Sequence, residues 1–268
     1  MEKKRLDVLL VEKGLFPTRQ KAQGAIMAGR VLVDGQKKDK AGTQVPVTAN
    51  IAVTGQDLPY VSRGGLKLEK ALAVFPVEMK GKTVLDVGAS TGGFTDCALK
   101  HGATRVIAVD VGYGQLAWEL RQDPRVTVLE RTNVRYLTLD QIGGQPVDIV
   151  TVDVSFISLS LVLPAVVPLA RETADYILLI KPQFEAGRHQ VGKHGVVKDP
   201  KAHRQVIIKI MEKGNELGLN PGGLDYSPIT GPEGNIEYLI WLTKNPVPAL
   251  LQDAAVEATV QAAHNSLC

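Results

Sequence analysis

The sequence predicts an α/β protein in which a seven-stranded, mostly parallel sheet follows a small N-terminal α+β domain. Two observations carry this prediction. From Thr83 onward, short apolar segments alternate with helical ones, which is typical of a parallel sheet covered by helices on both faces. Residues 1–58 instead combine short helical segments with short strands and turns. The 268 residues suffice for one full α/β domain and a small accessory domain.

The first domain is expected to hold two helices and two short strands. The apolar face formed by Leu6, Leu9 and Leu10 predicts a helix over residues 5–13, and Gly14 ends it. The remaining predicted elements are a helix over Thr18–Ala28, a strand and turn over Arg30–Gly35, and a strand over Ile51–Val53.

The second domain is expected to contain seven strands. They are predicted at Thr83–Asp86, Val106–Asp110, Val126–Glu130, Asp148–Asp153, Tyr176–Ile180, Gly223–Ser227 and Glu237–Leu242. The helices that cover them include Leu66–Val74, Phe94–His101 and Pro200–Leu217. The chain accordingly divides into a first domain (1–58), a linker (59–64), the α/β domain (65–245) and an Ala-rich, helical C-terminal tail (246–268).

Positive charge is concentrated in the first quarter of the chain. Residues 1–62 contain ten Lys and Arg against six Asp and Glu, whereas the remainder contains 21 against 22. Such a basic segment either meets an anionic partner or presents an ordinary solvated surface.

Cysteine content and hydropathy predict a cytoplasmic protein without membrane contact. Only Cys97 and Cys268 are present, so a reducing compartment is expected. No uninterrupted apolar run follows the charged N-terminus, which disfavours a signal peptide. The longest apolar-rich run, Ile157–Ala170, is broken by Pro164 and Pro168 and is too short to cross a bilayer.

A glycine-rich loop follows the first strand of the α/β domain. The segment reads Asp-Val-Gly-Ala-Ser-Thr-Gly-Gly-Phe over residues 86–94 and leads into a helix. Glycine lets the backbone approach a ligand, and a helix N-terminus offers free N–H groups. By itself the loop suits a nicotinamide cofactor, a flavin or S-adenosyl-L-methionine. The ligand-binding residues expected here are Gly88, Ser90, Gly92, Gly93 and Phe94.

Three details favour S-adenosyl-L-methionine as the cofactor. The glycine spacing differs from the Gly-x-Gly-x-x-Gly of dinucleotide sites. Asp86 ends the first strand, where a carboxylate suits the cationic methionyl group and would repel a pyrophosphate. Asp110 ends the second strand, where it can accept hydrogen bonds from ribose hydroxyls, and Asn133 is placed to meet the adenine. Each of the three residues could instead cap a helix or a turn.

Four polar residues are expected to meet at one edge of the sheet. Asp153 and Lys181 each follow an apolar strand, and Lys67 precedes the first strand. Glu237 joins them if the last strand pairs antiparallel with Gly223–Ser227. Such a set fits methylation of a ribose hydroxyl, which must lose its proton as it attacks the methyl group. Neutral Lys181 is the expected general base, the other three groups orient the hydroxyl and tune the base, and Asp153 also meets the cofactor.

Other chemistries fit the sequence less well. Methylation of exocyclic base nitrogens usually requires an Asn/Asp-Pro-Pro-aromatic turn, whereas Asp-Val-Ser-Phe stands at residues 153–156. Carbon-5 methylation of pyrimidines needs a cysteine near the fourth or fifth strand end, and none is present there. His189, His194 and His203 form no recognisable zinc pattern, so no metal site is expected.

Both parts of the chain resemble known families. Arg-Leu-Asp-Val-Leu-Leu at 5–10, Arg-Gln-Lys-Ala at 19–22 and Gly-Arg-Val-Leu-Val-Asp-Gly at 29–35 look like the RNA-binding domain first described in ribosomal small-subunit protein four. The remainder looks like the FtsJ-type 2′-O-ribose methyltransferases. Together with Val-Ser-Arg-Gly-Gly-Leu-Lys-Leu at 61–68, they resemble the TlyA family, sometimes labelled hemolysin A, over nearly the whole chain.

The resemblance implies a Rossmann-like class I methyltransferase domain that uses S-adenosyl-L-methionine. It also implies methylation of cytidine 2′-hydroxyls in ribosomal RNA (16S, 23S or both), so ribosomal RNA within ribosomal subunits is the expected partner. The Lys-Asp-Lys-Glu set of the FtsJ type falls on Lys67, Asp153, Lys181 and Glu237. The basic residues expected to contact RNA are Lys3, Lys4, Arg5, Arg19, Lys21, Arg30, Lys37 and Lys38, with Arg63 at the junction.

Two alternatives remain open at the level of sequence. One is a membrane-active hemolysin, which the lack of a spanning segment and of a basic amphipathic helix disfavours. The other is an RNA-binding assembly factor whose methyltransferase fold is not catalytic. The intact glycine-rich loop and the four polar positions disfavour that second alternative.

Overall fold

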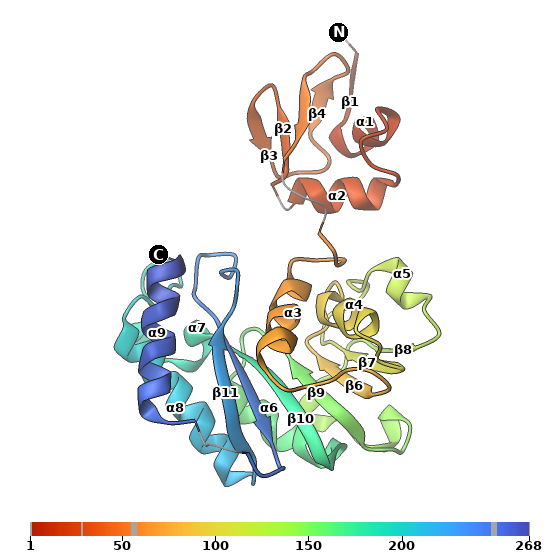
Figure 1. Cartoon of the computed structure of the whole chain (residues 1–268). Helices are drawn as coiled ribbons and strands as arrows, with labels where there is room; N and C mark the ends of the chain where they lie inside the picture. The colour runs from red at the N-terminus through yellow and green to blue at the C-terminus, as the bar shows by residue number, and fades with distance from the viewer. Residues whose placement is uncertain (1, 28, 55–57, 248–250, 268) are drawn as a thin grey trace. The chain divides into compact units, whose positions relative to one another are not determined.

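A computed structural model describes residues 2–27, 29–54, 58–247 and 251–267. The described residues form two compact units, one within residues 1–58 and one within 59–268 (Figure 1). The predicted helix end at Ala28 lies outside the described residues, as do 55–57 at the end of the first domain and 248–250 and 268 in the tail.

The smaller unit packs two helices against two small antiparallel sheets. Its elements are β1 (Lys3–Arg5), α1 (Leu6–Glu12), α2 (Arg19–Met27), β2 (Val31–Val33), β3 (Gln36–Lys38), β4 (Gln44–Pro46) and β5 (Ile51–Val53). One sheet has the order β3-β2-β5, and the other pairs β1 with β4. The predicted leucine face of α1 is buried with Phe16, Ile26 and Val31. Three strands escaped prediction (β1, β3 and β4) because each has three residues and most of their side chains are polar.

The larger unit contains the predicted seven-stranded sheet, in the order β11-β12-β10-β9-β6-β7-β8 (Figure 1). Its strands are β6 (Thr83–Val87), β7 (Arg105–Val109), β8 (Val126–Leu129), β9 (Val147–Val152), β10 (Ala170–Ile180), β11 (Asn220–Tyr226) and β12 (Tyr238–Thr243). Strands β6 to β10 pair in parallel, whereas β12 is antiparallel to both β10 and β11. The mostly parallel fold predicted from the sequence is confirmed.

Helices cover both faces of this sheet, and alternate strand residues supply the two cores. Val84 of β6 belongs to the core under α3 and α4, whereas its neighbour Leu85 belongs to the core under α6, α8 and α9. The helices are α3 (Gly64–Val74), α4 (Gly93–Lys100), α5 (Trp118–Arg121), α6 (Leu159–Val166), α7 (Pro182–Glu185), α8 (Pro200–Glu216) and α9 (Asp253–Leu267). Short 3-10 turns are η1 (Val134–Tyr136), η2 (Asp140–Ile142), η3 (Val167–Leu169) and η4 (Arg188–Gln190).

Helix α9 is an integral part of the larger unit. Val256, Val260 and Ala263 of this helix are buried in the same core as the α8 residues Val206 and Ile210. Burial of such side chains stabilises a packed helix far more than its intrinsic propensity does. Among the residues that the structure describes, no helix is long and apolar enough to cross a membrane.

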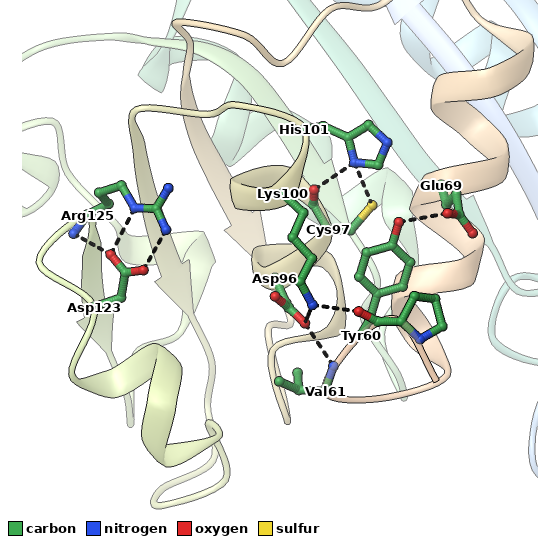
Figure 2. A network of polar contacts seen from close by, with 10 residues as sticks. Tyr60, Val61, Glu69, Asp96, Cys97, Lys100, His101, Asp123 and Arg125 are labelled. Carbon is green, nitrogen blue, oxygen red and sulfur yellow. Dashed lines mark hydrogen bonds and ion pairs between the residues drawn. The ribbon is translucent and has the colours of Figure 1, made fainter. Parts of the chain in front are cut away.

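Residues just after the boundary are fastened to α3 and α4 by polar contacts (Figure 2). The Tyr60 hydroxyl donates to Glu69 over 2.9 Å, and the backbone N–H of Val61 donates to Asp96 over 2.9 Å. Lys100 donates to the same Asp96 carboxylate and to the Pro59 carbonyl. These contacts fix the start of the larger unit, so Ser62 and Arg63 reach the edge of the sheet in a defined position.

Candidate active site

A cleft of about 790 Å³ lies at the carboxyl ends of β6, β9 and β10. Parallel α/β sheets commonly bind ligands at this edge. Gly88, Asp153 and Lys181 follow the three strands, and all of them line the cleft. From other elements the lining includes Arg63, Lys67, Ser90, Gly93, Phe94 and Glu237.

The glycine-rich loop is packed too closely for larger residues at two positions. Gly88 has a φ of 83°, and a Cβ there would stand 2.4 Å from the Asp153 carbonyl oxygen. At Gly93 a Cβ would stand 2.7 Å from the backbone nitrogen of Gly65, where α4 meets α3. Gly92 has a φ of 98° but does not line the cleft; a Cβ there would meet Leu120. The glycines are therefore required by backbone geometry as well as by access to the cleft.

The predicted ribose contact, Asp110, lies beside the same loop. Its carboxylate accepts from the backbone N–H of Ser90 over 2.8 Å and of Gly112 over 2.7 Å. It also lines a small hollow with Ser90 and Gln115. Asn133 caps η1 by accepting from the backbone N–H of Arg135 over 3.1 Å, and it lines neither the cleft nor the hollow.

Asp86 lies beneath the loop rather than at the cleft surface. The strand continues one residue past it, and Asp86 pairs in register with Thr151 of β9. The hydroxyls of Thr95 and Thr151 donate to its carboxylate over 2.6 and 3.0 Å. Burial raises the pKa of Asp86 to about 6, against the lowering effect of the two hydroxyls. Asp86 is not among the cleft-lining residues, and its predicted contact with the cofactor stays a prediction.

The four residues predicted to carry the chemistry lie together. Lys67 Nζ is 2.6 Å from Glu237 Oε2 and 3.4 Å from Asp153 Oδ2. Lys181 Nζ is 2.5 Å from Asp153 Oδ1. The antiparallel register pairs Ile180 with Tyr238, which places Glu237 beside the end of β10 as predicted. This set is called the tetrad below.

The tetrad is buried and electrostatically coupled. The side chains of both lysines are about 10% exposed or less, and that of Glu237 is 2% exposed. Burial acts to lower the pKa of Lys67, but attraction by Asp153 and Glu237 outweighs it and raises the pKa above the ordinary value. Lys67 is thus held as a cation between two carboxylates.

The cleft fits S-adenosyl-L-methionine by its size and by its donor set. Its volume is that of a site for a small organic ligand. The apolar walls of Ala89 and Phe94 suit the ligand's apolar parts, and Asp110 offers carboxylate oxygens at the second strand end. The carboxylate of Asp153 suits a cationic sulfonium.

Sequence reasoning missed several polar and aromatic residues of the cleft, among them Ser155, Phe156 and Gln183. The Ser155 hydroxyl accepts from Lys181 Nζ over 3.0 Å. Phe156 lines the cleft although it is 90% exposed and has a φ of 65°, and its ring lies 5.0 Å from that of Phe184. Gln183 lines the cleft beside Phe184. The available signal was the pair of segments Asp-Val-Ser-Phe and Lys-Pro-Gln-Phe, each directly following a strand.

The structure gives no metal centre within the described residues. His203 is buried in the core, where one ring nitrogen lies 2.9 Å from the Val197 carbonyl and the other 2.8 Å from the Tyr238 hydroxyl. Burial lowers the pKa of His203, which suits a neutral, structural ring.

The predicted RNA-binding residues of the smaller unit are all exposed or half-buried. Two of them are held by a common carboxylate: Arg5 and Arg19 each donate to the buried Asp7. Lys4 pairs with Glu12 over 2.9 Å, and Arg30 donates to the Thr54 carbonyl over 3.1 Å. Arg63 belongs to the larger unit and lines the cleft.

Comparisons with known proteins agree with this architecture. The FtsJ-like methyltransferase model matches residues 60–244, and the S4 domain model matches residues 4–51. YqxC of Bacillus subtilis is 51% identical over 270 residues, covering 99% of this chain and 96% of the relative. The 16S/23S rRNA (cytidine-2′-O)-methyltransferase TlyA of Mycobacterium tuberculosis is 49% identical over 259 residues, or 95% of this chain and 96% of that protein.

A solved structure points the same way. The hemolysin-like protein of Streptococcus thermophilus superimposes with a TM-score of 0.79 at 43% identity, covering 99% of this chain and 97% of the other. Fold and cleft thus define an S-adenosylmethionine-dependent methyltransferase of the FtsJ-like class. The chain belongs to the TlyA/hemolysin A family, whose members join an S4 domain to such a methyltransferase domain.

Proposed function

We propose that this protein transfers a methyl group from S-adenosyl-L-methionine to the 2′-hydroxyl of cytidine in ribosomal RNA. The observation that carries the proposal is the tetrad, in which two lysines and two carboxylates line the cleft and form three ion pairs of 2.5–3.4 Å. The TlyA relative is a 16S/23S rRNA methyltransferase according to its name. We propose the same two RNAs as the possible substrates of this chain. Such a substrate places the site of action in the cytoplasm.

In the proposed reaction, Lys181 Nζ takes the proton of the 2′-hydroxyl as the hydroxyl oxygen attacks the methyl group. S-adenosyl-L-methionine would supply that methyl group from its sulfonium cation, whose methyl–sulfur bond breaks so that a neutral thioether leaves. Asp153 and Glu237 offset the positive charges of the sulfonium and of the protonated Lys67, and Lys181 takes the proton as the proposed general base. Ser155 and Asp153 hold the Lys181 amine in place, so that alignment supplies much of the rate enhancement.

The cofactor is proposed to lie along the glycine-rich loop. Gly88, Ser90, Gly93 and Phe94 line the cleft next to Asp153, and Asp110 accepts from the ribose hydroxyls in exchange for its present backbone partners. Asp86 supports this loop from below through its two threonine contacts.

The smaller unit is proposed to hold the RNA. Its exposed lysines and arginines contact phosphates and 2′-hydroxyls on folded RNA, as expected for its S4 domain match. Contacts of this kind position an enzyme on its substrate but carry little sequence information.

The variant Lys181→Ala tests the assignment of the base. We expect methyl transfer to ribosomal RNA to fall by about a thousandfold, because a general base contributes 10²–10⁴ in rate. Binding of S-adenosyl-L-methionine, measured by calorimetry, is expected to persist. The matched control is Lys213→Ala, which removes a surface lysine paired with Glu216 on α8. Undiminished transfer by Lys181→Ala would remove Lys181 from the role of base.

A further inference from the structure

Gln183 presents a buried hydrogen-bond acceptor in the cleft. Its side-chain oxygen is shielded from solvent, and no described residue donates a hydrogen bond to it. Buried polar atoms of native proteins are nearly always paired, because an unpaired one costs the full desolvation penalty. The residue lines the cleft, so a ligand can supply the missing donor.

The backbone holds Gln183 at a fixed place relative to the tetrad. Gln183 follows Lys181 by two residues in α7, so their Cα atoms are at most about 7 Å apart. The backbone N–H of Phe184 donates to the Lys181 carbonyl over 2.9 Å. On the other side, the Glu185 carboxylate accepts from the Ser158 hydroxyl and the Leu159 backbone, each over 2.6 Å. Lys181 and Gln183 line the same cleft, so a nucleotide whose ribose lies at Lys181 can extend its base toward Gln183.

Two aromatic rings line the same cleft as Gln183. Phe156 and Phe184 are 5.0 Å apart with their planes tilted by 50°, and both line the cleft. The left-handed backbone at Phe156 (φ 65°) is unfavourable for a bulky residue, and the ring is 90% exposed. Exposed aromatic rings of this kind stack with unpaired bases in RNA-binding proteins.

We propose that Gln183 is the residue that recognises the target base, its side-chain carbonyl accepting a hydrogen bond from the exocyclic amino group of cytosine. Uracil presents a carbonyl oxygen where cytosine has the amino group, so in the present orientation of the Gln183 amide two acceptors face each other, and pairing with uracil requires the amide to turn. The proposal deepens the proposed function and rests on it, because it assigns base preference within the same methyl transfer.

The test compares cytidine with uridine at the methylated position. Two transcripts of the ribosomal RNA segment that carries the methylated cytidine are prepared, one natural and one with uridine at that position. Wild-type protein is expected to prefer the cytidine transcript in kcat/KM by about tenfold or more, since one buried hydrogen bond is at stake. Gln183→Leu is expected to reduce this preference to near unity.

Two further variants separate base recognition from a structural role. Gln183→Glu keeps a carbonyl-type acceptor, and carboxylates accept from the cytosine amino group, so it is expected to retain the preference. Gln261→Leu is the matched control, because Gln261 is an exposed glutamine of α9 that bonds Asn265. A merely structural role for Gln183 would lower kcat/KM for both transcripts together and leave their ratio unchanged.

The outcomes are distinguishable from failure of the proposed function. Transfer by Gln183→Leu with the cytidine preference intact overturns the base-recognition proposal and leaves the methyltransferase proposal standing. A raised KM for S-adenosyl-L-methionine, equal with both transcripts, would place Gln183 at the cofactor and also overturn it. Absence of transfer by the wild-type protein to either transcript would overturn both proposals.

Discussion

Each unit of this protein contains a cluster of carboxylates and cations, and the two clusters are built in opposite ways. In the smaller unit Asp7 is fully buried and accepts from Arg5, Arg19 and Gln23 over 2.7–3.0 Å. The two arginine side chains remain 44% and 53% exposed. The carboxylate is therefore used internally, and positive charge is left at the surface.

In the tetrad the lysines are buried as well as the carboxylates. Lys67 and Lys181 are shielded to nearly the same degree as Asp153, and all of them line one cleft. This difference in burial determines which function each cluster suits. Half-exposed guanidinium groups on a buried carboxylate suit the binding of an anionic surface, whereas buried lysines facing a cleft suit proton transfer in a site of low dielectric constant.

After Lys181→Ala, the largest effect in the tetrad is expected from Glu237→Gln. This change removes one of the two negative charges that hold Lys67, which lies 2.6 Å away. Single-turnover methyl transfer should fall by about a hundredfold or more, because the charges around the reacting hydroxyl no longer balance. RNA affinity, measured by filter binding, should stay within about twofold. A rate equal to that of the wild type would mean that the tetrad is an ordinary structural ion-pair network.

A smaller effect is expected from Asp86→Asn, and it depends on pH. Because burial raises the pKa of Asp86 to about 6, its contribution to stability is fully present below pH 4 and is lost as pH rises through 6. Relative to the wild type, Asp86→Asn should therefore gain about 2 kcal/mol in unfolding free energy between pH 4 and pH 7. Denaturant unfolding at the two pH values measures this gain.

The same variant tests whether the Asp86 carboxylate contacts S-adenosyl-L-methionine. Its carboxylate is occupied by Thr95 and Thr151, so affinity for S-adenosyl-L-methionine should change little. A tenfold loss of cofactor affinity, without a pH-dependent gain in stability, would return Asp86 to a direct role at the ligand.

The smallest effect is expected from Asp7→Asn. A hydrogen bond from Arg5 holds the pKa of Asp7 well below its usual range, so this carboxylate stabilises the fold above about pH 4 and stops doing so as pH falls. The variant should destabilise the smaller unit by about 1 kcal/mol at neutral pH, because its cationic partners are half-exposed. Hydrogen exchange in the full chain should quicken in α1 and α2 but not in β6 or β9. An equal increase of the exchange rate in both units would contradict the distinction between the two clusters.

Much of the larger unit could be predicted because its strands are long enough to show apolar runs. Strands β6, β7 and β9 lie within one residue of their predicted bounds. Strand β10 begins at Ala170 rather than Tyr176, because its first half contains exposed polar residues and a register shift before Asp175. In the smaller unit the apolar three-residue strands β2 and β5 were predicted, whereas the mostly polar strands β1, β3 and β4 were not.

The candidate site was predictable where chemistry follows a strand end and unpredictable where it depends on side-chain direction. The tetrad residues were found because strand ends of a parallel sheet share one edge. Asp86 is predicted to contact the cofactor, and this stays a prediction; in the structure the strand extends to Val87, and the Asp86 carboxylate accepts a hydrogen bond from Thr151 on the neighbouring strand. The unpaired oxygen of Gln183 depends on three-dimensional burial, which no sequence pattern reports.

The most direct test of the proposed 2′-O-methylation identifies the methylated atom. Wild-type protein is incubated with isotopically labelled S-adenosyl-L-methionine and ribosomal subunits that lack the modification, and the RNA is digested to nucleosides for mass spectrometry. We expect the label in 2′-O-methylcytidine, because the tetrad is suited to removing a proton from a ribose hydroxyl. Label on a nucleobase, or no label in ribosomal RNA, would contradict it.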